Sequence, residues 1–188
     1  MVKNKKNTNR FTEPEPGHFV QFYQSDLNLI LSLVEYIGSG LSSDETCIVI
    51  ATKPHMLALN DQLILHGIDV DEARHTGQYI VLDAAETLEK FMINDLPNRS
   101  RFFDVIGAML RDSALKGKPI RAYGEMVALL WKRGNKEAVI QLENLWNELI
   151  EKYSVSLYCA YPALHFIFDK EVQTEIHACH NGLLSSLS

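Results

Sequence analysis

Short apolar runs rich in β-branched residues alternate with amphipathic segments along most of the chain, and this alternation limits the fold more than any other feature. CIVIAT at 47–52 and YIVLD at 79–83 have the composition of buried strands. Similar runs are HFVQFY at 18–23, PIRAYG at 119–124 and SLYCAY at 156–161. Segments with apolar residues at helical spacing separate these runs. The order predicts a three-layer α/β/α domain with a mostly parallel sheet of about five strands.

The predicted helices begin near capping residues and several end at a glycine. Ser25 is a good N-cap for the first helix. In the helix that follows Thr52, we expect Leu57, Leu63 and Ile64 to face the core. The remaining helices are expected after Asp83, from Ser100 to Gly117, from Glu125 toward Gly134, over 136–152 and near 170–184.

The sequence divides into a polar tail over 1–16, which we expect to be flexible, and one domain over 17–188. The net charge of −6 disfavours nucleic acid as a partner. No apolar run is long enough for a membrane helix, so we expect no membrane partner. The 3 cysteines lack CxxC spacing, which favours a reducing compartment and predicts a cytoplasmic protein.

Ligands of open α/β sheets bind at the carboxyl ends of the strands. Nucleotide-binding members of this architecture place a glycine-rich loop after the first strand, where backbone N–H groups hold phosphates. Here Gln24, Ser25 and Asp26 follow the first strand, and neither GxxxxGK[ST] nor GxGxxG occurs. Nucleotide hydrolysis by that machinery is therefore disfavoured. The polar or turn residues at the predicted edge are Tyr23, Ser25, Thr52, Asp83, Gly124, Glu125, Tyr161 and Pro162.

Arg121 and Glu125 flank the end of the predicted fourth strand in RAYGEM. Glu125 is a candidate carboxylate base or ligand-binding group. The alternative interpretation is that Arg121 and Glu125 pair with each other, or with neighbours, and only stabilise the turn.

Several histidines and cysteines allow a metal-binding interpretation. His177 and His180 are three residues apart on a predicted helix and can share a face. Because no strict metal motif is present, we interpret them as structural residues and expect neither a metal nor another cofactor. A catalytic Cys–His pair is disfavoured because nothing in the sequence shows a cysteine and a histidine to be adjacent in the fold. The aromatic residues allow an apolar pocket, although their spacing favours the core: Phe22, Tyr23, Tyr123, Trp131, Trp146, Tyr158 and Tyr161.

The segments GHFVQFYQSD, GLSSDETCIVIAT, GQYIVLDAAETLEKFM, PIRAYGEMVALLW, LENLWNEL and SLYCAYP follow one another in this order. The sequence resembles the MEDS family, the methanogen/methylotroph sensory domain of a dichloromethane-responsive repressor, over about residues 17–182. The resemblance implies a RecA/KaiC-like core that lacks the Walker A loop. It also implies a role in sensing small molecules, hydrocarbon derivatives among them, with a histidine kinase or transcription regulator as partner. Its recurrent polar positions fall on His18, Tyr23, Arg121, Glu125, Tyr161 and His180, whereas His177 stands where the family favours cysteine.

The leading hypothesis is a stand-alone sensory domain without enzymatic activity that binds a small molecule, a hydrocarbon derivative or a nucleotide-like ligand, and passes the signal to a signalling protein. A homodimer is compatible with it. One alternative is a protein-interaction module whose former nucleotide cleft is filled by side chains such as Phe22. A second alternative is an enzyme that uses Glu125 as a general base. The expected ligand-binding residues are His18, Tyr23, Ser25, Arg121, Glu125, Tyr161 and His180.

Overall fold

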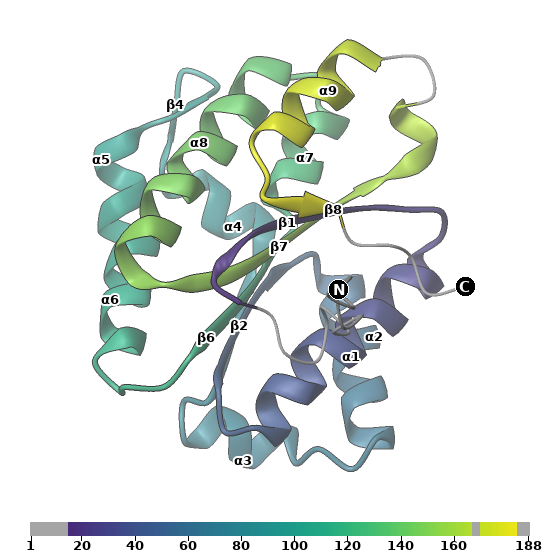
Figure 1. Cartoon of the computed structure of the whole chain (residues 1–188), viewed down its shortest axis with the longest axis vertical. Helices are drawn as coiled ribbons and strands as arrows, with labels where there is room; N and C mark the ends of the chain where they lie inside the picture. The colour runs from purple at the N-terminus through teal and green to yellow at the C-terminus, as the bar shows by residue number, and fades with distance from the viewer. Residues whose placement is uncertain (1–14, 167–169, 184–188) are drawn as a thin grey trace, which may run out of the picture.

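The computed structural model describes residues 15–166 and 170–183, and its centre is a parallel sheet of six strands (Figure 1). Five strands correspond to the predicted runs: β1 (Gly17–Tyr23), β2 (Thr46–Ala51), β3 (Tyr79–Asp83), β6 (Ile120–Gly124) and β7 (Val155–Pro162). The sixth, β8 (Gly182–Leu183), pairs with β1 at the sheet edge. The strand order is β3-β2-β6-β7-β1-β8, and each neighbouring pair is parallel. The predicted α/β fold is confirmed.

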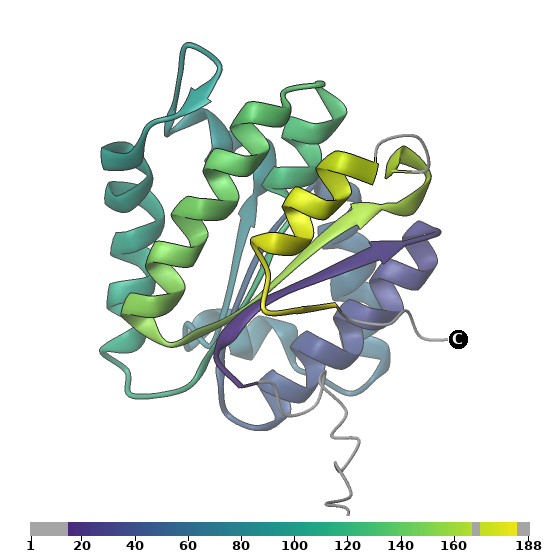
Figure 2. The ribbon, with the colours of Figure 1, turned by 45° about the horizontal axis from the view of Figure 1, so that its top comes forward.

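Helices cover both faces of the sheet, as the two views show (Figure 2). One face packs against α1 (Asp26–Ser42), α2 (Lys53–Leu65) and α3 (Val70–His75). The opposite face packs against the helices of the later part of the chain. These are α4 (Ala84–Glu89), α5 (Arg99–Phe102), α6 (Ala108–Ala114), α7 (Met126–Lys132), α8 (Lys136–Tyr153) and α9 (Lys170–Ala178).

Strand side chains alternate between two separate cores, as the two-residue period of a strand requires. Leu157 and Cys159 of β7 face the core under α8, whereas Tyr158 and Ala160 face the core under α1. In β1 the same alternation sends Val20 to the α8 side and Tyr23 to the α1 side. The odd and even positions of one strand therefore serve different sites.

The helix expected between Ser100 and Gly117 is present, with a π-helical turn, η1 (Phe103–Gly107), between α5 and α6. The inner face predicted for the second helix was partly wrong. In α2, Leu57 and Ile64 are 56% and 57% exposed, because Leu59 and Leu63, four residues apart, form the face that packs on the sheet.

The shortest elements carried too little periodic signal for prediction. They are α3, β8, the antiparallel pair β4 (Met92–Ile93) and β5 (Leu96–Pro97), and the 3-10 turn η2 (Ala163–Phe166). Among the described residues, no helix has the length and apolar character required to cross a bilayer.

The chain changes direction between β2 and β6. After β2 it continues through α2 and α3 to β3 on one side, whereas after β6 it continues through α7 and α8 to β7 on the other. Such a topological switch point is where open α/β sheets usually bind their ligands. The carboxyl ends of these two strands are followed by Thr52 and Glu125.

Candidate functional site

Glu125 occupies the switch point and is 5% exposed. Its backbone N–H donates to the Ile50 carbonyl (2.8 Å), which fixes the turn after β6 to strand β2. Its carboxylate accepts from the Thr52 N–H (2.7 Å) and from the Thr52 hydroxyl (3.2 Å). The carboxylate therefore caps the start of α2, where backbone donors lack helical partners.

His55, on the first turn of α2, connects this buried carboxylate to the surface. Its Nδ1 lies 2.8 Å from Glu125 Oε1, so Nδ1–H is the donor to the carboxylate. Its Nε2 lies 3.6 Å from Asp26 Oδ1 at the start of α1. The hydrogen bond to Glu125, together with the charges of Glu125 and Asp26, outweighs burial and raises the pKa of His55.

A cleft of about 430 Å³ lies next to this imidazole, between α1 and α2. This volume is within the range of small-molecule sites. The lining is apolar over much of its extent, with Asp26, His55, Asp61 and Gln62 as polar groups. Its other residues are Leu27, Ile30, Leu31, Pro54 and Ala58.

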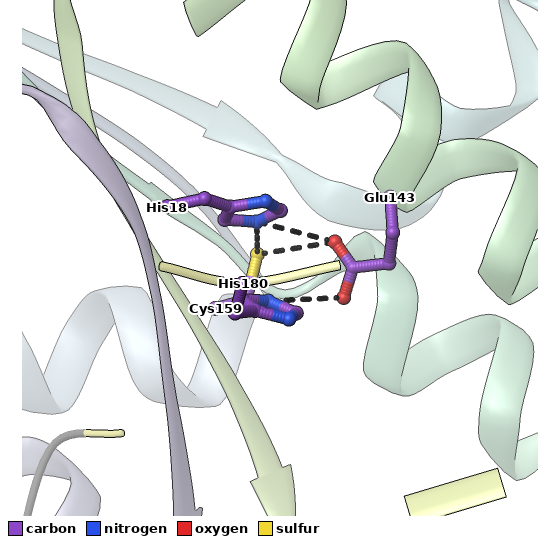
Figure 3. Close-up of side chains that lie close together, drawn as sticks. All are labelled: His18, Glu143, Cys159 and His180. Carbon is purple, nitrogen blue, oxygen red and sulfur yellow. Dashed lines mark hydrogen bonds and ion pairs between the residues drawn. The ribbon is translucent and has the colours of Figure 1, made fainter. Parts of the chain in front are cut away.

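A second constellation lies on the opposite face of the sheet, buried beneath α8 (Figure 3). His18 of β1, Glu143 of α8, Cys159 of β7 and His180, which follows α9, each direct one donor atom inward. These four atoms lie within 4.8 Å of one another. His18, Glu143 and Cys159 are 0% exposed.

The contacts inside this cluster centre on Glu143. His18 Nε2 is 3.3 Å from Glu143 Oε2 and 3.3 Å from Cys159 Sγ, which itself is 3.7 Å from Oε2. His180 Nε2 is 3.5 Å from Glu143 Oε1, and the Tyr161 hydroxyl donates to the same oxygen. We refer to His18, Glu143, Cys159 and His180 as the buried cluster.

The local environment sets the protonation of the cluster. Burial, only partly offset by the Glu143 carboxylate, lowers the pKa of His180 to about 4. Burial alone would raise the pKa of Glu143, but the adjacent imidazoles of His180 and His18 and the Tyr161 hydroxyl lower it to about 2. Burial and the Glu143 charge raise the pKa of Cys159 well above the ordinary thiol value. At neutral pH the cluster thus contains a carboxylate, a neutral His180 and a thiol.

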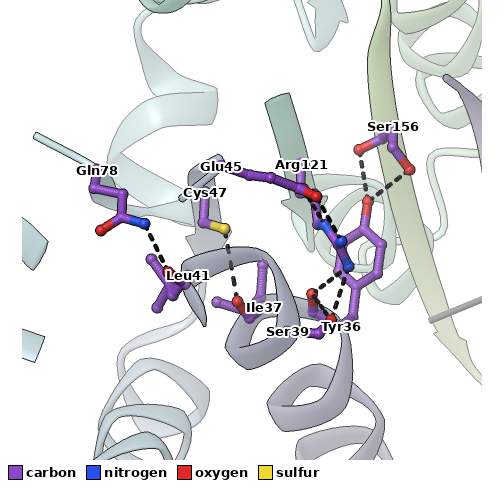
Figure 4. Close-up of polar contacts among 9 residues, drawn as sticks. All are labelled: Tyr36, Ile37, Ser39, Leu41, Glu45, Cys47, Gln78, Arg121 and Ser156. Atoms are coloured by element: carbon purple, nitrogen blue, oxygen red, sulfur yellow. Dashed lines mark hydrogen bonds and ion pairs between the residues drawn. The ribbon is translucent and has the colours of Figure 1, made fainter. Parts of the chain in front are cut away.

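Arg121 belongs to neither constellation. It is the second residue of β6, so its side chain lies at the amino end of the sheet, where it pairs with Glu45 (Figure 4). It also donates to the Tyr36 carbonyl (3.0 Å) and the Ser39 hydroxyl (2.9 Å) at the carboxyl-terminal part of α1. Arg121 and Glu125 therefore do not pair with each other, because the length of the strand separates them. Each pairs with other residues instead, which the alternative interpretation also allowed.

The remaining predicted residues divide between the two constellations. His18, Tyr161 and His180 meet in or beside the buried cluster, although Tyr161 was expected at the carboxyl edge of the sheet. Tyr23 and Ser25 lie at the carboxyl edge: Tyr23 is buried in the α1-side core and Ser25 caps α1 by accepting from the Asn28 N–H (3.2 Å). Most aromatic residues expected to favour the core do so: Tyr123, Trp146 and Tyr158 are almost fully buried, whereas Phe22 is only partly buried.

His55 and Glu143 were missed. His55 stands in an unremarkable KPHML segment and gains its role only from the approach of α2 to β6. Glu143 did carry a signal, because it lies four residues after Val139 and three before Trp146 on the apolar face of α8. A carboxylate on such a face requires buried partners.

The described residues form a three-layer α/β domain in which Gln24, Ser25 and Asp26, and not a glycine-rich loop, follow the first strand. Residues 17–181 match the family model described as MEDS, the methanogen/methylotroph, DcmR sensory domain. The chain therefore belongs to the MEDS family, and its domain is a sensory domain. No curated protein matches the sequence.

Proposed function

We propose that this sensory domain detects a small organic molecule that binds in the cleft between α1 and α2, against His55. The observation that carries the proposal is the position of the imidazole. One ring nitrogen is fixed by the buried Glu125 carboxylate, and the other lies at the wall of an apolar cleft beside the switch point. A fixed polar group in an apolar cleft is a common arrangement for small-molecule recognition.

The charges of the cleft limit the ligand. Asp26 and Asp61 contribute carboxylates, and the whole chain has a net charge of −6. A phosphate in the cleft would meet Asp26 at the start of α1 and Asp61 in the second half of α2. We therefore favour a neutral or cationic molecule with an apolar body, which includes simple hydrocarbon derivatives, over a nucleotide-like ligand.

Helix α1 offers a route from the cleft to a signalling partner. Its first turn carries Asp26 and Leu27 of the cleft, and its last turns contact Arg121 and Glu45 at the other end of the sheet. Leu27 and Leu31 are 67% and 39% exposed, so this helix also presents apolar side chains to solvent. A ligand that favours one position of α1 would change this surface, provided that its affinity differs between two states.

A non-enzymatic role agrees with the environment of Glu125. Both carboxylate oxygens accept hydrogen bonds from Thr52 or His55, and the residue is 5% exposed. A general base requires access to the proton that it removes.

A thermal-shift series with short alcohols, amines and halogenated hydrocarbons tests the proposal. A ligand at 100 times its Kd adds about 2.7 kcal/mol to the free energy of unfolding. We expect this stabilisation to disappear in Ala58→Phe, which fills the cleft, and in His55→Phe. His66→Gln, at the exposed end of the same helix, is the matched control and should respond like the wild type.

Equal stabilisation of the wild type and both cleft variants would place the ligand elsewhere and contradict the proposed site. Absence of stabilisation by all compounds would favour the protein-interaction alternative, for which the exposed apolar residues of α1 and α2 are the candidate surface.

A further inference from the structure

We propose that His18, Glu143, Cys159 and His180 bind one divalent transition-metal ion, with Zn²⁺ as the ion that fits the donor set best. This site lies on the other face of the sheet from the cleft and goes beyond the proposed function.

The donor set is the first argument. Two imidazole nitrogens, one thiolate and one carboxylate are all ligand types that Zn²⁺ accepts, at about 2.0–2.1 Å for nitrogen and about 2.3 Å for sulfur. Four ligands at such bond lengths around one tetrahedral centre lie roughly 3.3–3.8 Å from one another. The separations among His18 Nε2, Glu143 Oε2 and Cys159 Sγ, 3.3, 3.3 and 3.7 Å, fall in this range. His180 Nε2 lies 3.5 Å from the other carboxylate oxygen, Oε1, and the four donor atoms lie within 4.8 Å of one another, so binding of the ion requires only a small contraction.

The orientation of both imidazoles is the second argument. His180 donates from Nδ1 to the Ile176 carbonyl (2.6 Å), which leaves Nε2 as the inward lone pair. His18 Nδ1 lies 2.8 Å from Asn147 Oδ1, and Asn147 Nδ2 donates to the Cys179 carbonyl (3.0 Å). The amide is thereby oriented with its oxygen toward His18, so Nδ1 of His18 carries the proton and Nε2 faces the cluster. Metal-binding histidines are usually fixed in this way through their outer nitrogen.

The third argument is an unsatisfied polar atom. His180 Nε2 is buried and has no hydrogen-bond partner among the described residues. It faces Glu143 Oε1 at 3.5 Å, although a lone pair and a carboxylate oxygen repel each other. A cation between them removes the repulsion and supplies the missing partner.

The surroundings indicate a structural metal rather than a catalytic one. Four protein ligands complete a tetrahedral zinc site, whereas catalytic sites keep one position open. His180 precedes β8, and Asn181 already binds β1 through its N–H to the His18 carbonyl (2.6 Å). A metal would therefore attach the segment from α9 to β8 to the sheet, and its loss would release that segment.

The experiment is metal analysis of the full chain by mass spectrometry, after purification without chelators, followed by Co²⁺ titration of chelator-treated protein. We expect about one zinc per chain, and a Co²⁺ complex with the thiolate charge-transfer band and the intense visible bands of a tetrahedral site.

Asn147→Ala, which removes the partner of His18, should weaken Co²⁺ binding about 10- to 100-fold. Cys159→Ala should abolish the thiolate band. Cys179→Ala is the matched control, because this half-buried thiol lies next to His180 but outside the cluster.

A folded wild-type chain that neither contains metal nor takes up Zn²⁺ or Co²⁺ overturns the proposal, even if no variant folds. An unchanged thiolate band in folded Cys159→Ala overturns the assignment of the ligands. A wild-type chain that takes up no metal but shows a ligand response dependent on His55 contradicts this inference alone. Bound metal without a response to any compound contradicts only the proposed function.

Discussion

The two ends of strand β6 carry charged side chains with opposite environments. At the amino end, Arg121 is 1% exposed and its guanidinium is enclosed by Glu45, Tyr36 and Ser39. At the carboxyl end, Glu125 is also buried but reaches the cleft through His55. Two polar positions that are close in the sequence can therefore have different roles, since four residue steps along an extended strand separate Arg121 from Glu125 by about 13 Å. One end stabilises the scaffold, and the other has access to a ligand.

Removal of Glu45 should give the largest effect at the scaffold end. Glu45→Ala leaves the Arg121 guanidinium buried without its carboxylate, and breaking a buried pair in this way costs about 3 kcal/mol or more. We expect this loss in urea denaturation, with an unchanged response to cleft ligands. Arg121→Met, which removes the charge but keeps much of the volume, is the comparison and should cost less. A ligand response abolished in the folded Glu45→Ala protein would contradict the separation of the two ends.

Gly40→Ala is the next largest perturbation of the same end. An added Cβ would lie 2.7 Å from Cys47 Sγ and 2.9 Å from Arg121 Cδ, so the packing around the guanidinium must shift. Such overpacking costs about 1–3 kcal/mol. Gly38→Ala, on the same helix, meets only Leu63 Cδ2 at 3.3 Å and gains helix propensity. Equal denaturation midpoints for the two variants would show that the space beside Arg121 is not restricted.

Ser25→Ala tests the carboxyl end. Ser25 accepts from the Asn28 N–H and caps α1 at the cleft, so its loss should cost about 1 kcal/mol. Because the cap fixes the position of Asp26 and Leu27, we expect a weaker ligand response as well. Ser43→Ala, at the other end of α1, is the control and should change neither quantity. A stability loss without any change in ligand response would mean that the first turn of α1 does not shape the cleft.

The fold was largely predictable because each long strand is a continuous apolar run between helical patterns, as in CIVIAT and YIVLD. The sites were less predictable, because they depend on contacts between distant segments. His18, Tyr161 and His180 were selected individually, but their partner Glu143 becomes evident only when α8 lies across the sheet. Arg121 and Glu125 appeared to form one site because the sequence shows their spacing and not the direction of the strand.

The smallest expected effect is the pH dependence contributed by His55. Its pKa is raised in the folded protein, chiefly by the hydrogen bond to Glu125, from an unfolded value of about 6.5. The imidazole therefore binds its proton more tightly in the folded state than in the unfolded state. The resulting contribution to the free energy of unfolding is fully present below about pH 6.5. It is lost as pH rises through the folded pKa. Urea denaturation from pH 5.5 to 8.5 should show the wild type losing stability relative to His55→Gln over this interval. The same titration of His66→Gln should remain parallel to the wild type, because this exposed histidine is distant from Glu125. If the stability difference between the wild type and His55→Gln does not change with pH, His55 is held at the cleft by packing alone. The Glu125 charge at the switch point would then have no effect on the cleft through His55.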